Sequence, residues 1–249
     1  MLISRSSVED RRGNASAPGQ SSYDLTPQYQ RVLAAVSGGA SAGQSSTAAW
    51  LSSHAARDDA AFASYAFRQL AGPPSTTAQA DELALVRQIA ASRTAGQNAL
   101  AHQLNGGGYG SLFQSYLQQW EKSVSPAQAA AGAKMLQEAT QLADQVTTQA
   151  KHSFQRSRPY VLDPSLPTLD AGSTAPNASY PSGHATAAYA AATVLSALMP
   201  DKAQQFQQMA AQVAYSRVYS ALHFPSDVAA GAQVGVMVGA YMIKHDALP

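Results

Sequence analysis

Apolar residues recur at intervals of three and four along most of the chain, and no stretch shows the alternation typical of a strand. The clearest case lies in residues 125–153, where one face of a helix carries Met135, Ala139, Leu142, Val146 and Ala150. Ser125 and Pro126 before this repeat are typical of a helix N-terminus. The pattern predicts an all-α fold.

Glycine and proline divide the chain into helical segments from about residue 47 onward. The first segment ends at the Gly-Pro-Pro of residues 72–74, and the second ends at the glycines of residues 106–108, which we expect to form a flexible linker. Three more helices are expected over residues 184–198, 201–219 and 226–245. Residues 158–183 are rich in proline and lack periodicity, so they predict a long functional loop.

Composition excludes several classes of protein and site. The 249 residues include no cysteine, which excludes disulfides, thiolate metal sites and cysteine nucleophiles. The formal net charge is +1 and only 12% of residues are charged, so we expect no nucleic-acid partner. The apolar stretches 185–199 and 228–243 are shorter than the roughly 18 residues of a membrane helix. They predict buried bundle helices, with no stable membrane insertion.

The N-terminal segment, residues 1–22, differs from the rest of the chain. It begins with apolar residues and then turns polar, without the apolar centre of a secretory signal. We expect residues 1–22 to be disordered or foreign to the natural protein, and residues 23–249 to form the folded domain.

Two short motifs place basic residues and helix-start residues near the long loop. Lys151 precedes Arg158-Pro159 by seven positions, almost two turns, so a continuous helix would place both cations on one face. For a lone lysine-arginine pair, a solvated basic face is the more common explanation. Ser182, Gly183 and His184 stand at the mouth of a helix, where the serine could cap the helix or the turn could bind an anion.

A third motif joins Arg217, His223 and Asp227. A carboxylate four residues after a histidine can accept its Nδ1–H, which leaves Nε2 basic. Such a histidine serves as a base, a nucleophile or a metal ligand. The alternative is that Asp227 only stabilises a helix N-terminus.

A metal site receives little support from the sequence. The histidines outside the motifs are scattered, and no His-x-x-x-His or carboxylate cluster accompanies them. We therefore expect no metal.

The order of the three motifs resembles the signature of the type 2 phosphatidic acid phosphatase superfamily, which includes bacterial class A acid phosphatases and vanadium-dependent haloperoxidases. In this chain the signature reads Lys151-x6-Arg158-Pro159, Pro181-Ser182-Gly183-His184 and Ser216-Arg217-x5-His223-x3-Asp227. The resemblance is strongest over residues 145–235. It implies that residues 23–249 form a single acid phosphatase-like helical bundle, with the active site at helix ends in the bundle core.

The resemblance also implies a role for each motif residue. His223 would be the nucleophile that forms a phosphohistidine, His184 the general acid and base, and Asp227 the group that orients His223. The phosphate would be bound by Lys151, Arg158, Ser182, Gly183 and Arg217. The implied reaction is metal-independent hydrolysis of a broad range of phosphomonoesters, with possible phosphate transfer to alcohols.

Other functions share the same pocket in this superfamily. A vanadate-dependent haloperoxidase and a lipid phosphate or pyrophosphate phosphatase are the alternatives, and a non-enzymatic helical binding module is a third. No cofactor is expected to be required, and vanadate is expected to bind as a phosphate analogue. Related phosphatases suggest a homo-oligomer in the periplasm or outside the cell, although a cytoplasmic location also fits the visible N-terminus.

Overall fold

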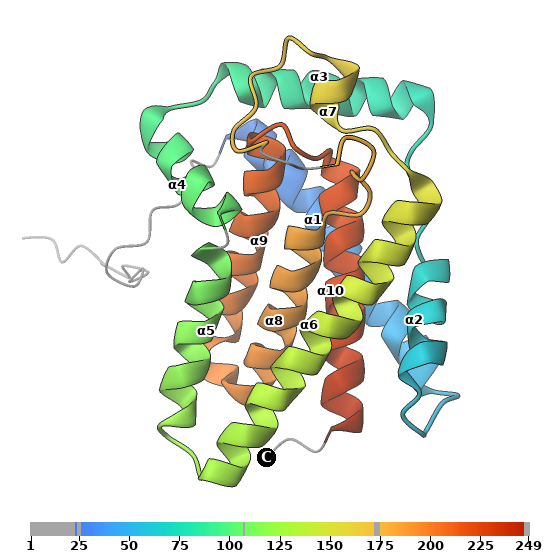
Figure 1. The fold of residues 1–249 in the computed structure, drawn as a ribbon, viewed down its shortest axis with the longest axis vertical. Helices are drawn as coiled ribbons and strands as arrows, with labels where there is room; N and C mark the ends of the chain where they lie inside the picture. The colour runs from blue at the N-terminus through green and yellow to red at the C-terminus, as the bar shows by residue number, and fades with distance from the viewer. Residues whose placement is uncertain (1–22, 24–25, 107, 172–174, 247–249) are drawn as a thin grey trace, which may run out of the picture.

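The computed structural model describes residues 23, 26–106, 108–171 and 175–246, and all regular structure within these ranges is helical. The helices pack side by side as a bundle, with α3 lying across one end (Figure 1). Their bounds are α1 Pro27–Leu51, α2 Asp59–Arg68, α3 Thr76–Ala91, α4 Ala95–Asn105, α5 Gly108–Glu121, α6 Pro126–Phe154, α7 Pro159–Leu162, α8 Gly183–Leu198, a 3-10 turn Pro200–Lys202, α9 Ala203–Tyr219 and α10 Pro225–His245. The predicted all-α, single-domain fold is confirmed for the described residues.

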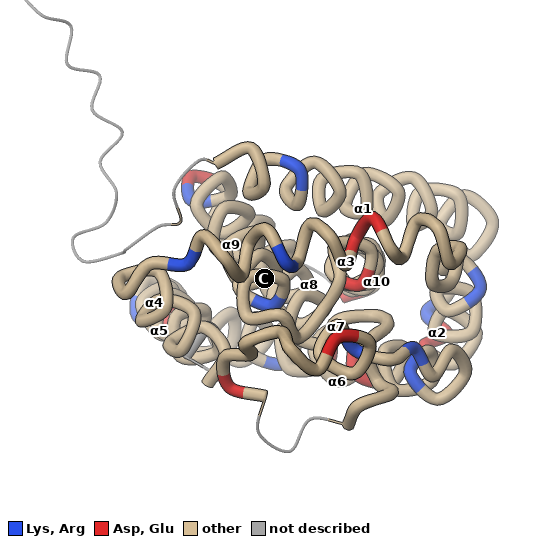
Figure 2. The backbone as a smooth tube through the Cα atoms, turned by 90° about the horizontal axis from the view of Figure 1, so that it is seen from above, with Lys and Arg blue, Asp and Glu red and all other residues tan. Residues whose placement is uncertain are grey.

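Helix α8 occupies the middle of the bundle, where α5, α6, α9 and α10 all contact it. Viewed from above in Figure 2, the other helices surround it, and charged positions are sparse along the backbone. Helix α1 packs along α10. Alanine on almost every side of α8 makes this central position feasible, because small side chains let several helices approach closely.

Three glycines on α10 allow an even closer approach to α8. A Cβ at Gly231 would lie 2.7 Å from the Ser182 carbonyl oxygen, and one at Gly235 would lie 2.4 Å from the Thr186 carbonyl oxygen. A Cβ at Gly239 would likewise lie 2.6 Å from Thr193 Cβ, two turns further along α8. The glycine spacing therefore fixes the distance between the N-termini of α8 and α10.

The first half of the chain differs from the sequence prediction at several points. Helix α1 begins at Pro27, capped by the Thr26 hydroxyl, some 20 residues before the predicted start. Residues 52–58 then interrupt the first predicted segment, and residues 92–94 interrupt the second. Asp58 and Thr94 cap the helices that follow these breaks. Each break is thus made by a capping side chain that the apolar pattern did not reveal.

The glycine-rich region after α4 also departs from the expected linker. Helix α5 begins at Gly108, and its Phe113 and Leu117 are buried against the core. This burial supports a helix that glycine content alone argues against. The last three predicted helices are confirmed as α8, α9 and α10.

One described helix, α10, has the length and apolar character of a membrane span, and 72% of its most apolar window is buried inside the structure. Residues 1–22 lie outside the described residues, so the expectation for that segment stays a prediction.

Candidate active site

The three sequence motifs meet at the end of the bundle that α3 crosses (Figure 1). Lys151 lies in the last turn of α6, and Arg158 immediately precedes α7. Arg217 lies in the last turn of α9. Ser182 precedes α8, and Asp227 lies in the first turn of α10. The site is therefore assembled from helix ends, as the resemblance implied.

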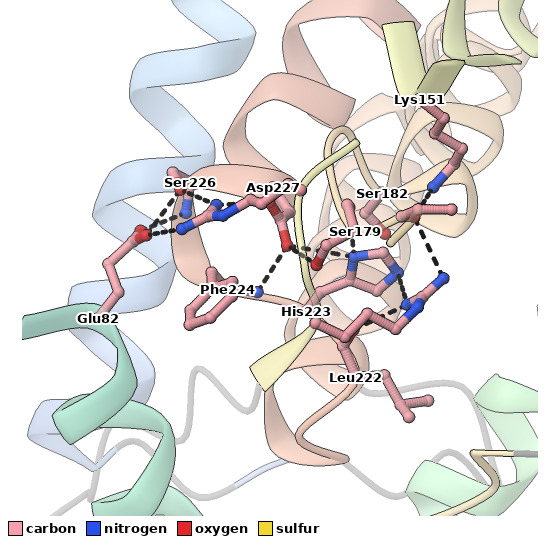
Figure 3. A network of polar contacts seen from close by, with 12 residues as sticks. Glu82, Lys151, Ser179, Ser182, Leu222, His223, Phe224, Ser226 and Asp227 are labelled. Atoms are coloured by element: carbon pink, nitrogen blue, oxygen red, sulfur yellow. Dashed lines mark hydrogen bonds and ion pairs between the residues drawn. The ribbon is translucent and has the colours of Figure 1, made fainter. Parts of the chain in front are cut away.

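His223 is buried, and both nitrogens of its ring have partners (Figure 3). Nδ1 lies 2.8 Å from the Ser179 carbonyl oxygen and 3.3 Å from Asp227 Oδ2. Nε2 lies 3.0 Å from Nη1 of Arg158. A guanidinium can only donate and a carbonyl can only accept, so Nδ1 carries the hydrogen and Nε2 presents its lone pair. Burial lowers the pKa of His223 well below its usual value, which keeps the ring neutral.

Asp227 is buried at the centre of a network of donors. Its Oδ2 accepts from the Ser179 hydroxyl at 2.5 Å and from the Phe224 N–H at 2.8 Å, while its Oδ1 accepts from Arg156 Nη1 at 2.6 Å. Burial raises the pKa of Asp227, but the hydrogen bond from His223 and the charge of Arg156 outweigh it and lower that pKa to about 2. Asp227 thus both faces His223 and stabilises the start of α10.

The nearer acceptor for His223 Nδ1 is the Ser179 carbonyl, not the carboxylate. The sequence pointed to Asp227 alone. Ser179 carries no motif of its own, so only the fold places it beside His223.

Lys151 and Arg158 come together, but not along one helix face. Helix α6 ends at Phe154, close to the predicted end, and Gln155 has a left-handed backbone with φ of 44°, so no continuous helix joins the two cations. Instead, both side chains donate to the Ala178 carbonyl, Arg158 through Nη2 at 3.2 Å. Burial and the charge of Arg158 lower the pKa of Lys151 to about 8. Such buried, mutually repelling cations favour a bound anion.

Ser182 occupies the N-cap position of α8, but its hydroxyl does not cap the helix. Its Oγ is buried and has no hydrogen-bond partner among the described residues. At Gly183, which follows, a Cβ would make only an ordinary van der Waals contact, with Thr147 Cγ2 at 3.7 Å. Of the two alternatives for this turn, the unpartnered hydroxyl favours anion binding, since buried polar groups are normally satisfied.

His184 and Arg217 both contact Asn105, the last residue of α4. His184 Nε2 lies 3.2 Å from the Asn105 main-chain oxygen, which places the hydrogen on Nε2. Arg217 Nη1 donates to the Asn105 side-chain oxygen. Burial and the charge of Arg217 lower the pKa of His184 to about 4. Asn105 was not predicted, because it stands in the glycine-rich region that sequence reasoning treated as a linker.

No group of three or more histidine or acidic side chains that could hold a metal ion occurs among the described residues. The positive charge at the site comes from side chains instead. Arg156, two positions before Arg158, is a further buried cation that the sequence analysis did not single out.

Comparison with known proteins agrees with this geometry. Residues 132–246 match the family model described as the PAP2 superfamily. The non-specific acid phosphatase of Salmonella typhimurium is 37% identical over 93 residues, which are 36% of this chain and 37% of that protein. The acid phosphatase of Zymomonas mobilis is 36% identical over 84 residues, which are 33% of this chain and 32% of that protein. The matches thus span about a third of the length of these curated relatives.

A solved structure also shares the fold. The crystal structure of Aquifex aeolicus LpxE is 26% identical, with a TM-score of 0.55, and the match covers 66% of this chain and 94% of that one. The fold and the site define a helical bundle in which buried cations and two histidines gather at helix ends. Every motif described above lies within residues 132–246, the part of the chain that matches the PAP2 superfamily model.

Proposed function

We propose that this protein is an acid phosphatase that hydrolyses phosphate monoesters through a phosphohistidine, without a metal. The observation that carries the proposal is the state of His223, whose Nε2 lone pair faces the guanidinium of Arg158 at 3.0 Å. An unprotonated nitrogen beside a phosphate-binding arginine is the arrangement that in-line attack on phosphorus needs.

The remaining residues take complementary roles in this proposal. Lys151, Arg158 and Arg217 neutralise the phosphoryl oxygens, and guanidinium groups bind them in bidentate fashion. The free Ser182 hydroxyl and the Gly183 N–H add donors at the start of α8. His184 would donate a proton to the leaving oxygen from its protonated, imidazolium form and, as the neutral imidazole left behind, would then accept a proton from the attacking water. Ser179 and Asp227 hold the Nδ1–H of His223 while the ring becomes positive.

The substrates would be small phosphomonoesters of broad range, with transfer to alcohols as a side reaction. The curated relatives named non-specific acid phosphatase support this class. From the family resemblance we also propose export to the periplasm or outside the cell and assembly as a homo-oligomer.

The test is hydrolysis of p-nitrophenyl phosphate between pH 5 and 7, with and without EDTA and orthovanadate. We expect activity that EDTA leaves intact and vanadate inhibits. His223→Ala should remove at least about three orders of magnitude of kcat, as loss of a nucleophile does in other covalent mechanisms. His54→Ala, at an exposed histidine stacked on Trp50, is the matched control.

Two results would overturn the proposal. Unchanged activity of His223→Ala would exclude the phosphohistidine. Vanadate-dependent bromination by peroxide without hydrolysis would identify a haloperoxidase.

A further inference from the structure

Arg156 links the His223–Asp227 pair to Glu82 of α3. In Figure 3, Glu82 and Lys151 lie on opposite sides of that pair. Its side chain is only 2% exposed. Nη1 donates to Asp227 Oδ1 at 2.6 Å and to Ser226 Oγ at 2.7 Å, while Nη2 donates to Glu82 Oε2 at 2.8 Å. The guanidinium also lies over the Phe224 ring, 4.0 Å from its centroid. Arg156 therefore has its donors committed to protein groups rather than to the site cavity.

Glu82 anchors this arginine from α3. Its Oε1 accepts from the Ser226 N–H at 2.6 Å, and its Oε2 accepts from the Ser226 hydroxyl at 2.8 Å. Glu82, Arg156 and Asp227 thus form a chain of alternating charges that clamps the first turn of α10. Only a guanidinium can bridge two carboxylates in this planar way, so lysine would not replace it fully.

The main chain of Arg156 acts on the same histidine by a second route. Its carbonyl accepts from the Ser179 N–H at 3.0 Å. The Ser179 carbonyl in turn is the nearer acceptor of His223 Nδ1–H, and the Ser179 hydroxyl donates to Asp227. One residue therefore holds both acceptors of the Nδ1 hydrogen, one through its side chain and one through its backbone.

We propose that Arg156, anchored by Glu82, is a positioning residue that keeps His223 in the tautomer with the hydrogen on Nδ1 and the lone pair on Nε2, the nitrogen that faces Arg158. It also neutralises part of the Asp227 charge. The importance of this tautomer for turnover rests on the proposed function. The charged and titratable groups that face the pair in the described structure are Arg156, Arg158, Lys151, Glu82 and Tyr180.

Arg156→Gln removes a positive charge beside Asp227, so His223 should bind a proton more readily. We expect kcat for p-nitrophenyl phosphate to fall about tenfold or more with KM within about threefold, as for other supporting residues behind a reacting group. The acidic limb of the kcat/KM profile should move to higher pH. Arg156→Lys keeps the positive charge. Its acidic limb should therefore lie at the wild-type pH, while kcat should recover only in part.

Glu82→Gln removes a negative charge from the same series of alternating charges. It is the variant to measure if Arg156→Gln does not fold. It should move the acidic limb in the opposite direction, to lower pH. The matched control is Arg57→Gln, which breaks contacts to Asp59, Glu138 and Asp246 at the far end of α10 and should leave the pH profile unchanged. A merely structural role for Arg156 would lower activity only in proportion to folded protein, with no shift of the limb, and would overturn the proposal.

Nuclear magnetic resonance of ¹⁵N-labelled histidine in the full chain tests the tautomer without any turnover. We expect His223 to carry its hydrogen on Nδ1 in the wild type and to show a mixture of tautomers in Arg156→Gln. An unchanged tautomer would overturn the proposal. If the wild type hydrolyses no phosphate monoester, the proposed function fails, while this spectrum still decides the role of Arg156.

Discussion

The main-chain N–H of Ser182 donates to the main-chain oxygen of Asp227 at 2.9 Å. This bond ties the N-terminus of α8 directly to the first turn of α10, so the serine-glycine turn and the His223–Asp227 pair are held as one unit. The contact requires the two helices to approach within backbone distance. Gly231 and Gly235 make that approach possible.

Gly235→Ala should therefore destabilise the bundle. The added methyl would lie 2.4 Å from the Thr186 carbonyl oxygen and 2.7 Å from Tyr189 Cβ, so α8 and α10 must separate. We expect a loss of about 1–3 kcal/mol in the free energy of unfolding, measured by urea denaturation. Gly38→Ala is the control, because a Cβ there meets nothing within 4 Å and should stabilise helix α1 by about 0.5–1 kcal/mol. Equal stability of the two variants would contradict the close approach.

Ser182→Ala should weaken phosphate binding without lowering the stability of the fold. The hydroxyl it removes is buried without a partner, so we expect the free energy of unfolding to stay unchanged or to rise by up to about 1 kcal/mol. Inhibition by phosphate should weaken about tenfold, because a charge-assisted hydrogen bond to the ligand is lost. Ser196→Ala, which removes a hydroxyl bonded to the Ala192 carbonyl on the same helix, should leave phosphate inhibition intact. A clear loss of stability in Ser182→Ala would show that its hydroxyl has a structural partner.

Lys151 should limit phosphate binding at alkaline pH. Burial and the neighbouring Arg158 lower its pKa to about 8, so the free enzyme loses this positive charge as the pH rises above that value. The inhibition constant of phosphate should then increase above pH 8. Lys151→Arg, whose guanidinium stays charged, should show no such increase up to about pH 10. The same alkaline increase in both proteins would assign the titration to another group.

His184 should make the protein less stable in acid. Its pKa in the folded state is lowered to about 4 by burial and by Arg217, against an ordinary histidine pKa of 6.5. The unfolded chain therefore binds a proton between these values that the folded protein does not. Stability should fall as the pH drops from 6.5 to 4, by about 3 kcal/mol at most.

His184→Gln should lose this part of the pH dependence, measured as the free energy of unfolding between pH 7 and 4. His152→Gln, at an exposed histidine of α6, is the control and should follow the wild type.

Phosphate binding should raise the pKa of His184 by neutralising the nearby cations, so binding at pH 6 should take up protons in calorimetry. Proton release on binding would contradict the assignment.

Helices with a strong apolar repeat were predicted from the sequence, and helices with a weak repeat were missed. Helices α6, α8, α9 and α10 follow from periodicity and proline positions. Helix α1 contains Gly39 and Gly43, which argue against a helix in isolation. In the fold these glycines lie against the backbone of Ala229 and Gln233, so packing on α10 accounts for them.

The sequence by itself determined the motif residues, because motif spacing and helix periodicity are local properties of the chain. It identified Lys151, Arg158, Arg217, both histidines and Asp227. The tertiary structure decided which partners those groups have. Glu82, Arg156 and Ser179 reach Asp227 or its neighbours from 48 to 144 positions away, and Asn105 meets Arg217 across 112. Such long-range contacts depend on the distances between packed helices. The glycines of α10 set the distance between α8 and α10 only when the two helices lie against each other.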